Sequence, residues 1–291
     1  MNALFPNALY TIHKGQSGGR GLSPRLWAHV HGSALSPDGN QNAFMFYDDF
    51  LNFSGFSPAI SGTTVLPSTT VPGPAGYKLY ADTTTSACGI APLATESGGV
   101  TQLSVGATDN HEVWLQSGNN FGAISDTAGS DKLTIFEARV RFTQVADNAN
   151  AVFVGLAEEG LNAADTKADN TGVMASKDFI GFNTVQADGD SLLFSYRKAG
   201  QTQQDVLTYG TALSAATWYK FGFVYNPKAP ESKRISVFVD NEEQSTYVTA
   251  TNIAAATFPD GEELGLLTGM KTGGATAASF DLDWVAFYQE G

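Results

Sequence analysis

The chain has 291 residues, a formal net charge of −13 and a pI near 4.6. An acidic protein of this kind has the wrong sign of charge to hold nucleic acid through its phosphates, so we expect no nucleic-acid partner. No apolar run approaches the roughly 20 residues of a spanning helix, so we expect no membrane partner. Only 15% of the residues are charged, and 31 Gly and 19 Phe are present, a composition that favours sheets and tight turns.

Cysteine content and the first residues indicate a cytoplasmic folding environment. A single cysteine, Cys88, excludes an intrachain disulfide. Residues 1–7 lack the charged start and the apolar stretch of a signal peptide. We therefore expect synthesis and folding in a reducing cytoplasm.

Residues 1–45 are predicted to form an extended N-terminal arm. They are irregular and rich in Gly and Ser, and they carry three basic residues against one acidic residue, a charge of +2, whereas the remainder has 13 basic and 28 acidic residues, a charge of −15. Because the arm has too many apolar residues to remain in water, we expect it to become ordered on a partner protein. The candidate interface residues are Leu4, Phe5, Tyr10, Lys14, Arg20, Leu22, Arg25 and Trp27.

Residues 46–291 are predicted to form a β-sandwich with a long loop, rich in Pro, Thr and Gly, near residues 54–98. Apolar and charged residues alternate over 134–142, which predicts a half-buried strand with Glu137, Arg139 and Arg141 on the solvent side. In the strand expected at 279–289, one face is predicted to hold Phe280, Leu282, Trp284, Ala286 and Tyr288.

About a dozen strand candidates are separated by turn signals every eight to twelve residues or so. Scarcely any stretch has a helical pattern, and no repeat of fixed period indicates a propeller or solenoid. The sequence therefore predicts an all-β, two-sheet antiparallel sandwich.

Several of these strands carry a family resemblance. Residues 218–225 (WYKFGFVY) and 234–240 (RISVFVD) resemble paired strands of laminin G-like and concanavalin A-like lectin/glucanase modules. Residues 283–288 (DWVAFY) look like the final strand of that family, and residues 47–50 (YDDF) are similar to its first. The resemblance implies a jelly-roll sandwich of the concanavalin A-like type.

A narrower resemblance concerns residues 98–116, 136–142 and 152–157. This series looks like a group of tailed-bacteriophage virion proteins that carry one such sandwich. It implies a structural protein that decorates or cements a capsid, with its N-terminal arm attached to the major capsid protein. It also implies a homo-oligomer, a trimer or dimer, on the particle surface. The alternative is a virion appendage that binds a host-surface glycan or receptor.

An enzyme is not expected. Retaining glycosidases with this fold need two carboxylates about 5 Å apart, and the family's Glu-x-Asp-x-x-Glu spacing is absent. Asp281 and Asp283 are two residues apart on one strand, but nothing acidic follows them there. Nucleophile and phosphate-loop motifs are absent as well.

Two kinds of binding site remain open. Calcium could use the oxygens of Asp165, Asp169 and Asn170 in one loop, or Asp188 and Asp190 in another, although no metal is assigned.

For a glycan, the candidates are Glu112, Trp114 and Gln116, which share one strand face and could present an aromatic ring to a sugar. In the alternative, Trp114 lies in the core; the alternation slightly favours Val113 and Leu115 as the buried pair.

Overall fold

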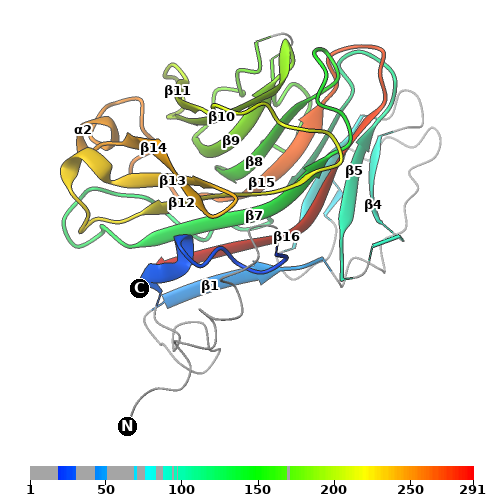
Figure 1. Cartoon of the computed structure of the whole chain (residues 1–291). Coiled ribbons are helices and arrows are strands. Elements are labelled where there is room, and N and C mark those ends of the chain that lie inside the picture. The colour runs from blue at the N-terminus through cyan, green and yellow to red at the C-terminus, as the bar shows by residue number, and fades with distance from the viewer. Residues whose placement is uncertain are drawn as a thin grey trace.

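The computed structural model describes residues 19–30, 43–50, 69–70, 76–82, 88–93, 95–96, 98–168 and 171–291. Two antiparallel sheets pack face to face (Figure 1). The predicted all-β, two-sheet antiparallel sandwich is confirmed. No helix among these residues has the length and apolar character that crossing a membrane requires.

Sheet A has eight strands, and its central pair is β7 and β16. In spatial order its strands are β14 (Glu242–Val248), β13 (Ile235–Val239), β12 (Trp218–Tyr225), β7 (Thr134–Phe142), β16 (Ala278–Glu290), β5 (Thr101–Val105) and β4 (Gly89–Pro92). The eighth strand, β1 (Ala43–Asp48), also pairs with β16. Because β16 is 13 residues long, β5 and β1 lie one after the other along the edge of β16 opposite β7.

Sheet B also has eight strands. In spatial order they are β11 (Gln204–Thr208), β10 (Asp188–Arg197), β9 (Phe179–Val185), β8 (Ala151–Ala157), β15 (Gly265–Lys271), β6 (Glu112–Gln116), β3 (Lys78–Ala81) and β2 (Thr69–Thr70). The helices of the described residues are short: the 3-10 helices η1 (Leu26–His29) and η4 (Glu231–Lys233), and α2 (Ala250–Ile253).

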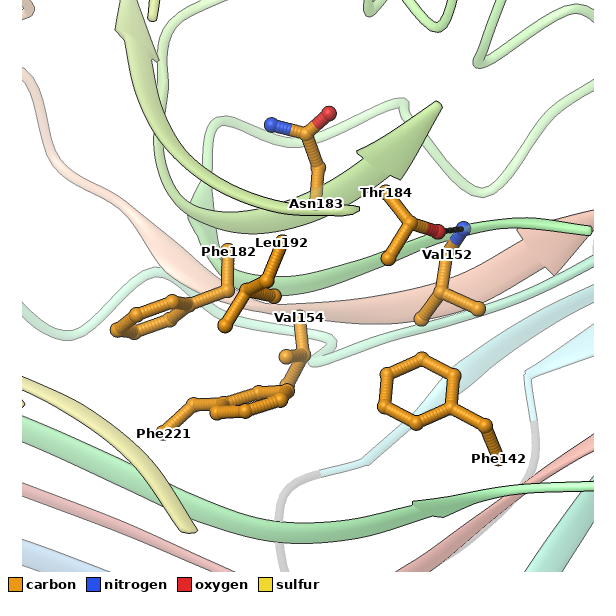
Figure 2. Close-up of a pocket in the computed structure, with 8 residues that line it drawn as sticks. All are labelled: Phe142, Val152, Val154, Phe182, Asn183, Thr184, Leu192 and Phe221. Atoms are coloured by element: carbon orange, nitrogen blue, oxygen red, sulfur yellow. Dashed lines mark hydrogen bonds between the residues drawn. The ribbon is translucent and has the colours of Figure 1, made fainter. Parts of the chain in front are cut away.

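The core lies between the two sheets. Side chains from β7 and β12 of sheet A meet side chains from β8, β9 and β10 of sheet B, and the space between them is too small for a water molecule (Figure 2). Asn183 lies on the other face of β9 and points away from this core. The inward face expected for residues 134–142 is confirmed, since Phe136, Ala138, Val140 and Phe142 are all buried.

The opposite face of β7 is not exposed to solvent, contrary to the sequence-based expectation. Glu137 is 1% exposed and Arg139 is 9% exposed. The reason is that residues 19–30 lie on this outer face of sheet A, on the side away from sheet B (Figure 1). All residues of β7 except the partly exposed Arg141 are therefore buried, on both faces of the strand.

The predicted face of the last strand is wrong beyond Leu282. Leu282 pairs with Val140 and Trp284 pairs with Arg139, so Asp283 is an extra residue that forms a β-bulge. Phe280 and Leu282 point into the core, and after the bulge Val285 and Phe287 do so. Trp284, Ala286 and Tyr288 instead join an apolar cluster on the outer face.

Two predicted boundaries also differ from the structure. The border between arm and sandwich, placed after residue 45, falls inside β1, and residues 19–30 already contact sheet A. The loop predicted near 54–98 includes the strands β2, β3 and β4. Residues 1–18, 31–42 and 51–68 lie outside the described residues.

A close approach of β8 and β9 predicts that Gly181 cannot be enlarged. A Cβ atom there would lie 2.7 Å from both Gly155 Cα and Val154 O, which are backbone atoms of the neighbouring strand. We expect Gly181→Ala to lower the free energy of unfolding by about 1–3 kcal/mol, as overpacking does. Urea unfolding measures this. The control is Gly210→Ala, where a Cβ atom meets nothing within 4 Å; equal unfolding midpoints for both variants would contradict the prediction.

Candidate functional site

Residues 19–30, the anchor segment, are fixed to the outer face of sheet A by apolar contacts. Leu26 is fully buried and Trp27 is 6% exposed, and both belong to a cluster that includes Ile135, Val224 and Trp284. The helical turn η1 carries both side chains. A Cβ atom on Gly222 would lie 2.4 Å from Leu26 Cδ2. The Leu26 side chain can pack here because this position of β12 is a glycine.

A buried carboxylate, Glu137 of β7, connects the anchor segment to the centre of sheet A. Its Oε2 atom accepts hydrogen bonds from the backbone N–H of Ser23 (3.0 Å) and from Trp27 Nε1 (2.7 Å). Burial raises the pKa of Glu137, while these hydrogen bonds and the positive charge of Lys220 oppose the rise. Lys220 Nζ in turn donates to Gly21 O (3.2 Å), and burial lowers the pKa of Lys220.

The bulge in β16 supplies the second connection. Arg20 Nε lies 3.0 and 2.9 Å from the two carboxylate oxygens of Asp283, and Arg139 pairs with the same carboxylate at 2.5 Å. Trp284 Nε1 donates to Arg20 O at 2.5 Å. Because Asp283 is the bulged residue, its side chain and that of Trp284 both reach the anchor segment.

A second ion pair lies beside this one on the same face. Asp281 is 1% exposed and pairs with Arg141 at 2.8 Å, and Arg141 also pairs with Glu96 at 2.8 Å. The ring of Trp218 lies 4.2 Å from Arg139 Cζ and 4.5 Å from Arg141 Cζ. Asp281 and Asp283, the two neighbouring carboxylates of β16, thus each pair with an arginine of β7.

The candidate interface residues divide into two groups. Arg20 and Trp27 contact sheet A, Leu22 packs against the outer cluster, and Arg25 pairs with Glu242. These four therefore have partners within their own chain, and their contact with a capsid stays a prediction. The other four, Leu4, Phe5, Tyr10 and Lys14, lie outside the described residues.

The glycan candidates Glu112, Trp114 and Gln116 do share the outer face of sheet B, but this face is covered. Residues 158–168, the cover segment, cross it, and Gln116 Oε1 accepts from the backbone N–H of residues 160, 161 and 162 at 3.1, 3.0 and 3.2 Å. Glu112 accepts from Asp165 N and, at 2.7 Å, from Trp114 Nε1.

Burial rules out the predicted role of the tryptophan. Trp114 is 0% exposed and packs in a cluster with Phe153, Phe179 and Leu161 of the cover segment. The expectation that its ring stacks on a sugar is wrong for this arrangement. The preference for Val113 and Leu115 as inward residues is confirmed, although the outer face of β6 is buried as well.

The calcium candidates do not gather into a metal site. Among the described residues, no three His, Cys, Asp or Glu side chains are close enough together to hold an ion. Asp165 accepts from Lys271 Nζ at 3.3 Å, while Asp169 and Asn170 lie outside the described residues. Asp188 and Asp190 both lie at the start of β10, where desolvation, and then the hydrogen bond and charge of Asp190, raise the pKa of Asp188.

A carboxyl pair joins the start of the cover segment to the start of β9. Glu158 pairs with Lys177 and accepts from Asp178 N at 2.9 Å. Burial raises the pKa of Asp178 to about 6, and the hydrogen bond and charge of Glu158 add to this rise.

The sequence does not predict the contacts of Ser23, Lys220 and Lys167 on these faces. A backbone N–H donor or a single lysine has no recognisable sequence motif. One signal was available: alternate arginines at 139 and 141 and alternate aspartates at 281 and 283 have the spacing of cross-strand ion pairs.

Comparisons with known proteins concern the fold. No family model and no curated protein matches the chain. A protein of unknown function from Shewanella oneidensis MR-1 is similar in structure, with a TM-score of 0.51 and 16% identity, over 89% of this chain and 91% of that one.

Two further solved structures have lower scores. Peanut lectin with a 9mer peptide has a TM-score of 0.49 and 12% identity, over 85% of this chain and 97% of that one. An endo-1,3-beta-glucanase from Streptomyces sioyaensis has a TM-score of 0.48 and 13% identity, over 88% of this chain and 99% of that one.

The contact between Trp27 and Glu137 predicts a stability effect. We expect Trp27→Phe to lower the free energy of unfolding by about 1–3 kcal/mol, because a buried carboxylate loses a donor while the ring is largely kept. Urea unfolding measures the change. The control is Arg25→Ala, which removes an ion pair between side chains that are 52% and 72% exposed and should cost less than about 1 kcal/mol. A larger loss for Arg25→Ala would contradict the prediction.

The raised pKa of Asp178 predicts a pH effect of definite sign. A carboxyl whose folded pKa is about 6 instead of 3.8 stabilises the fold at low pH, and this contribution is lost as pH rises from 3.8 through 6. We expect the Tm of the wild type, relative to Asp178→Asn, to fall by on the order of a few degrees between pH 4 and pH 7. The exposed control Asp126→Asn should show no such trend; a relative Tm that rises over this range would refute the assignment.

Proposed function

We propose that this chain is a non-enzymatic structural protein that decorates or cements a bacteriophage capsid. In this proposal residues 1–18 bind the major capsid protein, the anchor segment fixes them to the sandwich, and the sandwich projects from the particle. The resemblance of residues 98–116, 136–142 and 152–157 to virion proteins supplies the class of function.

The attachment of the anchor segment to the two central strands of sheet A is the observation that carries the proposal. Glu137 belongs to β7 and Asp283 to β16, and both accept hydrogen bonds from the anchor segment. A pull on residues before 19 is therefore transmitted to strands paired on both edges. An anchor segment bound to these central strands resists such a pull better than one bound to an edge strand.

The residues available for the capsid contact are the four candidates that precede the anchor segment. Leu4, Phe5 and Tyr10 offer apolar surface, and Lys14 offers a positive charge, ahead of a body with a large negative charge. Burying apolar area contributes about 25 cal/mol per Å² before ordering costs are subtracted. We propose that neighbouring copies form a homo-oligomer around a symmetry axis of the particle. Residues 1–18 of several copies then bind the capsid together.

The engagement of the charged groups also supports a structural role. Asp281 and Asp283 are held by Arg141 and Arg139, and Glu137 lies beneath the anchor segment. These carboxylates join strands to one another and to the anchor segment. The candidate residues for glycan binding are buried under the cover segment, so the glycan-binding alternative is not proposed.

Deleting residues 1–18 tests this function. We expect the truncated chain to keep the Tm of the full chain, because the anchor segment is retained, and to lose at least about 100-fold in affinity for purified capsids, as loss of several buried apolar groups implies. Co-sedimentation with capsids of the phage that encodes the chain measures the affinity. The control is Leu4→Ser with Phe5→Ser in the full chain, which should weaken attachment in the same direction. Unchanged co-sedimentation of the deletion would overturn the proposal.

A further inference from the structure

Lys167, in the cover segment, is fully buried, and among the described residues no carboxylate is hydrogen-bonded or ion-paired to its amine. Its relative exposure is 0%, and its Nζ atom donates to Thr184 O (2.9 Å), Val152 O (3.2 Å) and Asn183 Oδ1 (3.4 Å). All three acceptors are uncharged. A buried ammonium group normally requires a compensating charge, so this position favours the neutral amine.

The contacts of Lys167 with strands β8 and β9 of sheet B explain how it holds the cover segment. The paired residues of β8 and β9 end at Phe153 and Asn183, and the next pair is joined by Thr184 Oγ1 accepting from Val152 N at 2.9 Å. Lys167 Nζ caps the carbonyls of Val152 and Thr184, the two residues of that joined pair. The tip of the cover segment is thus attached where the two strands separate.

Charged groups around Lys167 lie at the periphery of this contact. Asp205 of β11 is reached through a chain in which Asn183 Nδ2 donates to Ser195 Oγ (2.6 Å) and Ser195 Oγ donates to Asp205 Oδ1 (2.5 Å). On the other side Lys271 Nζ, from β15, donates to the backbone oxygen of Lys167 at 3.0 Å.

Two carboxylates complete the surroundings of Lys271. It pairs with Asp165, in the cover segment, and Glu112 of β6 accepts from Asp165 N. The charge of Lys271 is therefore matched by its own neighbours. Within the part of the chain that the structure describes, Asp205 is the one carboxylate that acts on Lys167 as a counter-charge.

We propose that Lys167 is a proton-controlled latch, which holds residues 158–168 on the outer face of sheet B most firmly when its side chain is the uncharged amine. Protonation leaves an ammonium group in a site lined by neutral acceptors. Opening the segment transfers that group to water. The apolar surface that opening uncovers includes Trp114, Phe153 and Phe179.

The direction of the pH effect follows from burial. Burial lowers the pKa of Lys167 from 10.5 to about 7, whereas the opened segment has the ordinary value. Opening therefore takes up a proton between these two pH values. Closure is firmest above pH 10.5, weakens as pH falls to about 7, and does not weaken further below that. From pH 9 to pH 7 the opening equilibrium should increase by about 50-fold.

Amide hydrogen exchange of the full chain tests the latch. The backbone N–H groups of Leu161 and Asn162 are bonded to Gln116 and report opening of the segment. After correction for the intrinsic exchange rate, we expect about 50-fold greater protection at pH 9 than at pH 7. Lys167→Met should abolish the difference, and the exposed control Lys228→Met should keep it. Equal protection at both pH values in the wild type, or a difference that survives in Lys167→Met, would overturn the proposal.

A second measurement needs no substitution at Lys167, which would remove a donor from two carbonyls. The ¹³Cε chemical shift of Lys167 in the wild-type chain should titrate with a midpoint near 7. Asp205→Asn, at an exposed position, should lower the midpoint, because it removes the counter-charge at the end of the hydrogen-bond chain. A midpoint near 10.5, or no response to Asp205→Asn, would refute the latch.

Discussion

The burial of one carboxylate, Glu137, is the constraint on which the outer face of sheet A depends. A carboxylate in the middle of a sheet is costly unless donors reach it, and the donors here come from a segment more than a hundred residues earlier in the chain. The anchor segment therefore does more than cover apolar surface. Its backbone and its tryptophan replace the water that Glu137 would otherwise need, and Arg20 does the same for Asp283.

The outer faces of both sheets are closed by irregular segments of the same chain, in similar ways. On sheet A the anchor segment donates to carboxylates, and on sheet B the cover segment donates to Gln116 and Glu112. Glycines make close packing possible in both places: Gly222 admits Leu26, and Gly269 admits the ring of Trp114. The two differ in how a buried basic group is paired: Arg20 of the anchor segment pairs with the carboxylate of Asp283, whereas Lys167 of the cover segment donates to uncharged oxygens.

The alternation of apolar and charged residues predicted the inward faces of the strands well and the outer faces poorly. Period-two patterns report which residues of a strand face the core, so Phe136, Val140, Val113 and Leu115 were placed correctly. The pattern assumes that a charged residue on the other face meets water. Glu137 violates this, because its cover is distant in sequence. The bulge at Asp283 shifted the pattern by one residue, and a single acidic residue in a strand gives no warning of that shift.

The face that receives the anchor segment is assembled from strands at 134–142, 218–225 and 278–290. During translation residues 19–30 are made long before their binding face, since Asp283 and Trp284, which hold Arg20, follow some 260 residues later. The segment therefore spends nearly the whole of synthesis without its binding face. Until then Leu26 and Trp27 have no sheet of their own to cover them.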